Sequence, residues 1–142
     1  MKPIAMSALV ATLVSLSSPI AAQTATEADQ AQAQDSLSIY FGSGSAQVAA
    51  DQQPTLDQAA RLFREGSPIV MIVAGGADTV GSPDANLDLS VRRAQAVADG
   101  LVARGIPAER LQVVGRGNSE LAVPTDGGVD SRENRVVEIT WR

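Results

Sequence analysis

Cysteine and histidine are both absent from the 142-residue sequence. Without cysteine, the chain cannot form disulfides, thiolate metal sites or a lipid attachment through an N-terminal cysteine. Without histidine, it lacks the side chain that most often serves as an acid, a base or a metal ligand near neutral pH. The sequence therefore predicts no catalytic site, no metal site and no cofactor.

Aromatic side chains and positive charge are also scarce. The net charge of −5 argues against a nucleic-acid partner, which would require a basic face. Hydrophobic residues make up 44% of the chain, enough for a packed core. That core must be built from Val, Leu, Ile and Ala, because the aromatic residues are only four: Tyr40, Phe41, Phe63 and Trp141.

Residues 1–22 have the pattern of a secretory signal peptide. Lys2 precedes an apolar run over residues 4–14, and small residues suited to cleavage end at Ala22. The apolar run is short for a membrane span. We therefore expect export to the periplasm, cleavage after Ala22 and no transmembrane span in the mature chain. A retained N-terminal anchor is the alternative.

Residues 23–36 are rich in Ala, Gln, Thr and acidic residues without apolar periodicity, which predicts a flexible spacer. Residues 37–142 then form one domain. Apolar runs predict four strands, at residues 37–41, 69–73, 111–114 and 135–141. The order β-α-β-α-β-β predicts an α/β (α+β) two-layer sandwich, with both helices on one face of a mixed four-stranded sheet.

Helical periodicity lies between these strands. Pro54 opens the first helix, and the motif Ser82-Pro83-Asp84 opens the second with an N-cap, an early proline and an acid. The apolar stripe of the first helix is Leu56, Ala59, Ala60 and Phe63. The buried face predicted for the second is Leu87, Val91, Ala94, Ala98 and Leu101.

A candidate ligand site follows the second strand, where ligands of open α/β sheets tend to bind. Asp78 stands just beyond the strand end, after two glycines. On a helical wheel, Asn86 and Arg93 fall on the same flank of the buried stripe, whereas Arg92 faces the other side. We expect Asp78, Asn86 and Arg93 to converge, and Arg92 to be solvated.

An aspartate and an arginine in one cleft have two interpretations. They can form a structural salt bridge, or they can bind a zwitterionic ligand, with the carboxylate accepting from an ammonium and the guanidinium clamping a carboxylate. Spacing leaves both interpretations open.

An enzyme that uses Asp78 and Asp84 as acid and base is a third hypothesis. It is disfavoured, since scattered surface acids are the simpler explanation. The sequence also lacks nucleotide-binding and hydrolase motifs.

From about Ser38 to Trp141 the sequence resembles the OmpA-like C-terminal domain family, a family of peptidoglycan-binding modules. The order and spacing of several motifs carry the resemblance: YFGSGSA at residues 40–46, AGGADTVG at 74–81, NLDLSVRRAQAV at 86–97, GIP at 105–107, VGRG at 114–117 and ENRVVEI at 133–139.

This resemblance implies non-covalent binding of peptidoglycan through the meso-diaminopimelate of the stem peptide. By motif match, Asp78 takes the ammonium of that group and Arg93 takes its carboxylate. Ser90 is expected to pack the helix and not to contact ligand. The remaining positions matched to the family's binding region are Asn86, Thr79, Gly81, Asn134 and Arg135.

Two departures from the family pattern fall near the expected cleft. The usual histidine is missing from the loop, which reads Gly76-Ala77-Asp78, and Val136 replaces the second arginine of the terminal motif. Both changes remove polar groups, so we expect weaker affinity. They also motivate an alternative function, in which the module contacts an outer-membrane or other envelope protein and its wall site is weakened.

Overall fold

The computed structural model describes residues 36–142. The predicted signal peptide and residues 23–35 of the predicted spacer lie outside this range, while Ser36 is already the first residue of a strand. The helices and strands, in chain order, are β1 (Ser36–Tyr40), α2 (Gln53–Gly66), β2 (Met71–Gly75), α3 (Pro83–Val102), β3 (Leu111–Gly115) and β4 (Val136–Trp141). Short 3-10 turns lie at Ala50–Gln52, Ala108–Arg110 and Arg132–Asn134.

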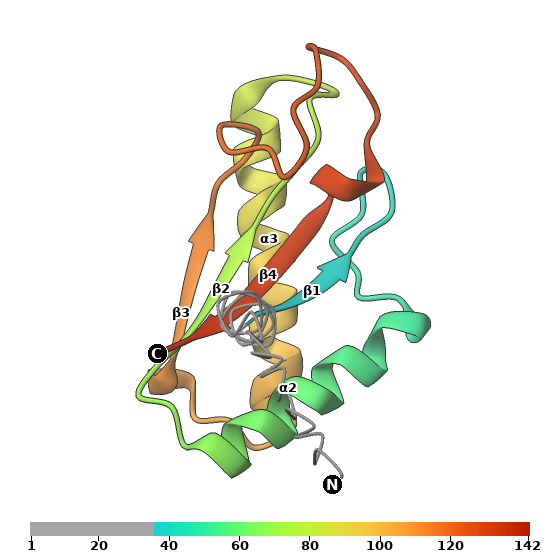
Figure 1. Ribbon diagram of the computed structural model, residues 1–142. Coiled ribbons are helices and arrows are strands. Elements are labelled where there is room, and N and C mark those ends of the chain that lie inside the picture. The colour runs from blue at the N-terminus through green and yellow to red at the C-terminus, as the bar shows by residue number, and fades with distance from the viewer. Residues whose placement is uncertain (1–35) are drawn as a thin grey trace, which may run out of the picture.

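The four strands form one mixed sheet in the order β1-β4-β2-β3. β4 is antiparallel to both of its neighbours, whereas β2 and β3 are parallel and are joined through α3. Figure 1 shows α3 running behind the sheet and α2 crossing below it. The predicted two-layer architecture and element order are therefore confirmed.

Both helices begin as their sequences predict. The Ser82 hydroxyl accepts a hydrogen bond from the amide of Ala85 at 3.2 Å and so caps α3, which starts at Pro83. Asp84 lies in the first turn, near the positive end of the helix. α2 carries Pro54 in its first turn and ends where Ser67 adopts a left-handed conformation with φ 44°.

The second strand begins two residues later than predicted. Ile69 is 76% exposed, and the amides of Ile69 and Val70 donate to the carbonyl of Arg142 instead of joining the β2–β3 ladder. The apolar run predicted the strand correctly but not the residue at which it begins. β2 continues to Gly75, in what the pattern suggested was already the loop.

The buried face of α3 differs from the predicted one. Leu87 and Val91 are 48% and 42% exposed, while Ala94, Ala98 and Leu101 are buried as expected. Towards its first turns, α3 buries polar residues instead: Asn86, Ser90 and Arg93. There the helix lies over strand-end glycines and loop carbonyls, so this part of its inner face needs hydrogen-bond donors more than apolar volume.

The close approach of α3 to the sheet depends on Gly75. A Cβ atom at Gly75 would lie 2.0 Å from the carbonyl oxygen of Ser90, which is backbone and cannot rotate away. Ser90 uses the same closeness, since its hydroxyl donates to Leu87 O at 2.7 Å and accepts from the amide of Gly117 at 2.8 Å. The predicted packing role of Ser90 therefore agrees with its contacts.

Replacing Gly75 with Ala is expected to destabilise the fold by about 1–3 kcal/mol or more, because α3 and β2 must separate. Gly66→Ala is the matched control, since its Cβ would meet no atom within 4 Å and alanine suits the helix better. Denaturant unfolding followed by the fluorescence of Trp141, the only tryptophan, measures both. Equal stability of the two variants would contradict the close approach.

Candidate functional site

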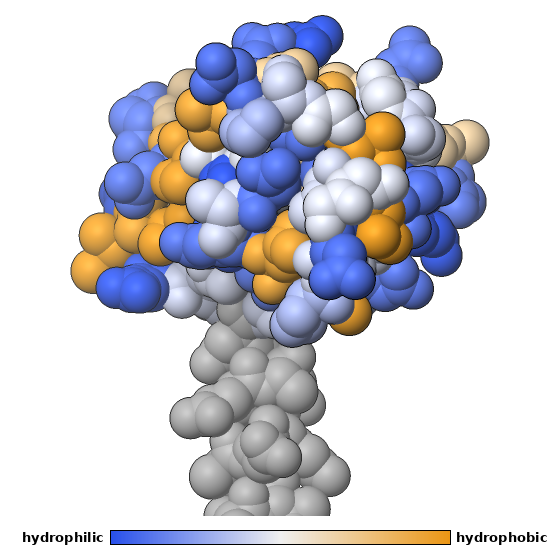
Figure 2. Space-filling model, turned by 90° about the horizontal axis from the view of Figure 1, so that it is seen from above, coloured by the Kyte–Doolittle hydropathy of each residue, from blue (hydrophilic) through white to orange (hydrophobic). Residues whose placement is uncertain are grey.

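The matched residues gather at one end of the molecule, where β2 and β3 end and α3 begins. Figure 1 shows the long loop after β3 reaching across this end, above the start of α3. Seen from above in Figure 2, the surface here mixes hydrophilic and hydrophobic residues and shows no single continuous apolar patch. A polar ligand suits such a surface better than a large apolar partner.

Arg93 is the largest fully buried side chain, at 1% exposure. Its guanidinium donates to three backbone carbonyls: Nε to Ser45 O at 2.8 Å, Nη1 to Gly76 O at 3.1 Å and Nη2 to Gly42 O at 3.0 Å. It also lies 5.5 Å from the centre of the Phe41 ring. Burial lowers the pKa of Arg93 to about 10, so the side chain remains charged at neutral pH.

Asp78 is also buried, at 6% exposure, so it is not a surface acid. Its Oδ1 accepts from the amide of Val80 at 3.2 Å, and its Oδ2 accepts from Arg135 Nη1 at 3.2 Å and from the amide of Ser131 at 3.4 Å. Burial alone would raise the pKa of Asp78, but these donors together hold it below its usual 3.8. The carboxyl is therefore ionised at neutral pH.

The salt bridge of Asp78 is made with Arg135 and not with Arg93. Among the ion pairs of residues 36–142, none joins Asp78 to Arg93, although the charge of Asp78 is close enough to raise the pKa of Arg93. Of the two interpretations that spacing left open, the structural Asp78–Arg93 salt bridge is therefore not the arrangement seen, since the partner of Asp78 is Arg135. Arg92 is exposed, as predicted, and pairs with Asp88 at 2.8 Å.

Asn86 lies on the inner face of α3 and is 4% exposed. Its side-chain Nδ2 is the one buried side-chain polar atom of residues 36–142 that has no hydrogen-bond partner. Gly81, also matched to the family's binding region, precedes this helix with φ 88°, a conformation that favours glycine. Its contribution is thus to the backbone path between Asp78 and α3.

The side chains of Thr79 and Asn134 form their hydrogen bonds with residues of the loop between β3 and β4. The Thr79 hydroxyl donates to Asp126 O at 2.6 Å and accepts from the amide of Val129 at 3.0 Å. Asn134 accepts from the amide of Val123 at 2.7 Å and donates to its carbonyl at 2.8 Å. Both side chains therefore anchor the loop.

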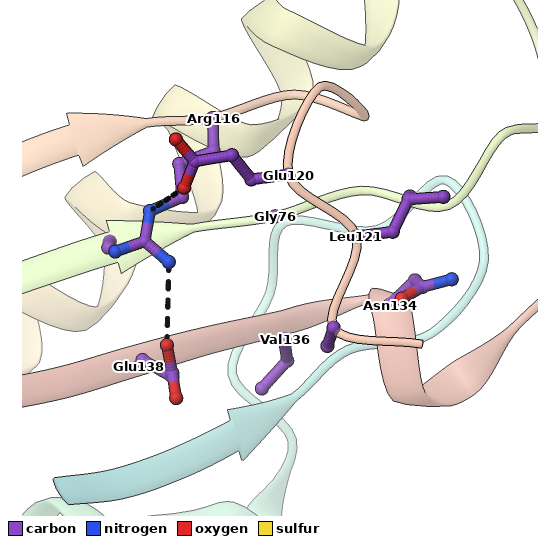
Figure 3. Close-up of a pocket in the computed structure, with 9 residues that line it drawn as sticks. Gly76, Arg116, Glu120, Leu121, Asn134, Val136 and Glu138 are labelled. Atoms are coloured by element: carbon purple, nitrogen blue, oxygen red, sulfur yellow. Dashed lines mark hydrogen bonds and ion pairs between the residues drawn. The ribbon is translucent and has the colours of Figure 1, made fainter. Parts of the chain in front are cut away.

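The two departures from the family pattern lie in different places. Ala77 is buried next to Asp78. Val136 belongs to the other face of the sheet, where it lines a cavity of about 320 Å³ beside Arg116, which is ion-paired with both Glu120 and Glu138 (Figure 3). Neither Asp78 nor Arg93 lines that cavity. The expectation that Val136 removes a polar group from around the Asp78–Arg93 cleft is therefore wrong.

Several groups that shape the site carry no sequence signal. Asp130 pairs with Arg135 through Nη1, the same nitrogen that contacts Asp78, and the Ser131 amide reaches Asp78 directly. The carbonyls of Gly42 and Ser45 orient Arg93. Backbone amides and carbonyls are common to nearly all residue types, so no residue pattern could have identified them.

Two absences concern the part of the chain that the structure describes. Residues 36–142 contain no helix long and apolar enough to cross a membrane. In the same range, no three acidic side chains come together in a way that could hold a metal ion.

Sequence comparison gives a consistent picture. The model of the OmpA family matches residues 40–135. The peptidoglycan-associated lipoprotein of Rhizobium meliloti is 34% identical over 102 residues, which are 71% of this chain and 58% of the relative. Outer membrane protein A of Yersinia pseudotuberculosis is 38% identical over 86 residues, 57% of this chain and 24% of the relative. The chain thus matches less than two thirds of the length of these relatives.

Solved structures share the fold at lower identity. The peptidoglycan-associated lipoprotein of Burkholderia pseudomallei aligns with a TM-score of 0.68 at 24% identity, covering 74% of this chain and 89% of the other. The C-terminal domain of Helicobacter pylori MotB aligns with a TM-score of 0.66 at 20% identity, covering 75% and 84%. With the family model matched over most of the described residues, the chain belongs to the OmpA family.

Proposed function

We propose that the protein binds peptidoglycan non-covalently and tethers the cell envelope, taking the meso-diaminopimelate of the stem peptide as its ligand group. The family match and the relatives named for their association with peptidoglycan support the wall as partner. The same relatives support a periplasmic location near the outer membrane or the wall. The role is binding and not catalysis.

The observation that carries this proposal is the buried charge of Arg93. No carboxylate of residues 36–142 forms an ion pair with it, and a buried cation without a counter-ion costs several kcal/mol. Three of its five N–H donors are used by carbonyls, which leaves one on each terminal nitrogen. Those two suit one carboxylate held in a bidentate pair.

Asp78 and Asn86 complement this carboxylate site. A carboxylate has about four acceptor positions, and Asp78 uses three of them, which leaves room for one ammonium donor. The free Nδ2 of Asn86 can donate to a ligand oxygen. The side-chain end of diaminopimelate carries an ammonium and a carboxylate on one carbon, which match Asp78 and Arg93 respectively. Because Arg93 is nearly inaccessible, the surrounding loops must part as the ligand enters.

A second candidate function is contact with an envelope protein through the open face of the sheet. Both helices of residues 36–142 pack on the opposite face, and the open face holds the cavity beside Arg116 and Glu138. This function predicts that the wild type ignores purified sacculi. It also predicts that Glu138→Gln weakens cross-linking to the partner in cells, whereas Asp78→Asn does not.

Asp78→Asn is expected to weaken binding to purified sacculi about tenfold to a hundredfold, since the loss of one charge-assisted contact costs about 1.5–3 kcal/mol. Asp84→Asn is the control, because Asp84 is an exposed acid in the first turn of α3. Co-sedimentation of both variants and the wild type measures the effect. Equal binding by all three would refute the role of Asp78.

Arg93→Lys is expected to lower sacculus affinity at least tenfold, because lysine retains the charge but cannot form a bidentate pair. Arg92→Lys, on the neighbouring exposed position, should bind as the wild type does. Thermal melts of both variants establish that each is folded at the assay temperature. A folded Arg93→Lys variant with wild-type affinity would exclude the guanidinium clamp.

The diamino acid itself is tested with soluble stem peptides. A peptide containing meso-diaminopimelate is expected to raise the thermal midpoint of the wild type and to compete with sacculi, because ligand binding stabilises the folded state. The same peptide with lysine in that position lacks the side-chain carboxylate and should do neither. Equal competition by the two peptides would leave wall binding intact but contradict recognition of that carboxylate by Arg93.

A further inference from the structure

The loop between β3 and β4 is attached to the chain segment that carries Asp78. Figure 1 shows this loop crossing the top of the molecule from β3 towards β4. The shortest hydrogen bonds between its middle and Thr79 run from the Thr79 hydroxyl to Asp126 O at 2.6 Å, from Gly128 N to Thr79 O at 2.9 Å and from Val129 N to the Thr79 hydroxyl at 3.0 Å. Thr79 therefore anchors the loop.

The hydroxyl of Thr79 has little capacity left for a ligand. It donates its one proton to Asp126 at a short distance and accepts from Val129. The hydroxyl of Thr125 lies a further 3.5 Å away. A direct ligand contact would have to break one of the loop contacts, so the side chain is better suited to hold the loop than to hold a ligand.

The residues that hold Asp78 in place come soon after Val129, the loop residue whose amide binds Thr79. Val129 is followed by Asp130, which pairs with Arg135, and by Ser131, whose amide donates to Asp78. Arg135 itself donates to Asp78 Oδ2 and, through Nε, to Phe41 O at 3.0 Å. Asp130 and Ser131 therefore directly follow the Val129 amide that Thr79 binds, and Arg135 comes a few residues later, just before β4 begins.

We propose that Thr79 is a positioning residue for wall binding: by pinning residues 126–129, it holds Asp130, Ser131 and Arg135 against Asp78 and so fixes the orientation in which that acid meets the ligand. The inference rests on the proposed function, because it assigns Thr79 a role in the same site. It places Thr79 outside direct ligand contact, unlike the role suggested by motif match.

Thr79→Val tests this role with little risk to the fold. Valine keeps the shape of threonine but removes the donor and the acceptor, and the exposed loop amide of Val129 can turn to water instead. Thr79→Ser keeps the hydroxyl and is the rescue variant. Thr140→Val, within β4 and outside the loop, controls for the same chemical change elsewhere.

The first measurement is the pKa of the Asp78 carboxyl, which NMR titration determines in the three variants and the wild type. The contacts from Arg135 and Ser131 lower that pKa, so release of the loop in Thr79→Val should move it upwards, towards the ordinary value. Thr79→Ser and Thr140→Val should titrate as the wild type does. This measurement needs no wall ligand.

The second measurement is sacculus affinity. Thr79→Val is expected to bind several-fold to tenfold more weakly, with wild-type affinity retained by Thr79→Ser and Thr140→Val. An unchanged Asp78 pKa in Thr79→Val overturns the positioning role, as does a shifted pKa with unchanged affinity. If the wild type itself does not bind sacculi, the proposed function fails, and with it the role of Thr79 in wall binding, whereas the titration still decides whether Thr79 positions the acid.

Discussion

The guanidinium of Arg93 holds three separate parts of the chain in place. It reaches from the middle of α3 to the loop after β1, through Gly42 and Ser45, and to the turn after β2, through Gly76. These carbonyls lie in the segments that follow β1 and β2, outside the hydrogen-bond ladder of the sheet. A single arginine therefore satisfies acceptors from two loops, and the geometry of the whole end of the molecule depends on it.

This arrangement separates two kinds of arginine–aspartate chemistry. Arg135 forms ion pairs with both Asp78 and Asp130, so the charge of this arginine is fully compensated by acids of the fold itself. Arg93 forms its hydrogen bonds with backbone carbonyls only, which stabilise the cation less than a paired carboxylate would. The same helix also buries the unpaired amide nitrogen of Asn86. Both side chains therefore have unused hydrogen-bonding capacity, which is what the proposed binding site requires.

The residues matched to the family's binding region consequently divide by what their side chains already contact. Thr79 and Asn134 form their side-chain hydrogen bonds with the β3–β4 loop, and Gly81 supplies a backbone conformation. Arg93 and Asn86 retain free donors. The first set shapes the end of the sheet, and the second set is the one that we propose for the ligand, with Asp78 between them as an acid that is both anchored and still able to accept.

The sequence alone determined the element order and the sheet class, because apolar periodicity, the Ser82-Pro83 cap and glycine turns act locally. The family came from a resemblance carried by motifs, and not from these local patterns. The sequence also separated Arg93 from Arg92, since a helix fixes the direction of neighbouring side chains. Tertiary structure decided which residue pairs with Asp78: Arg135 lies 57 positions along the chain, and no local rule brings it there. It also decided that Leu87 and Val91 remain half exposed while Asn86 and Arg93 turn inward. Apolar periodicity predicts a buried helix face on the assumption that it packs against apolar side chains. Here the start of α3 faces backbone carbonyls and glycines, and no residue pattern predicts that these carbonyls require hydrogen-bond donors from the helix.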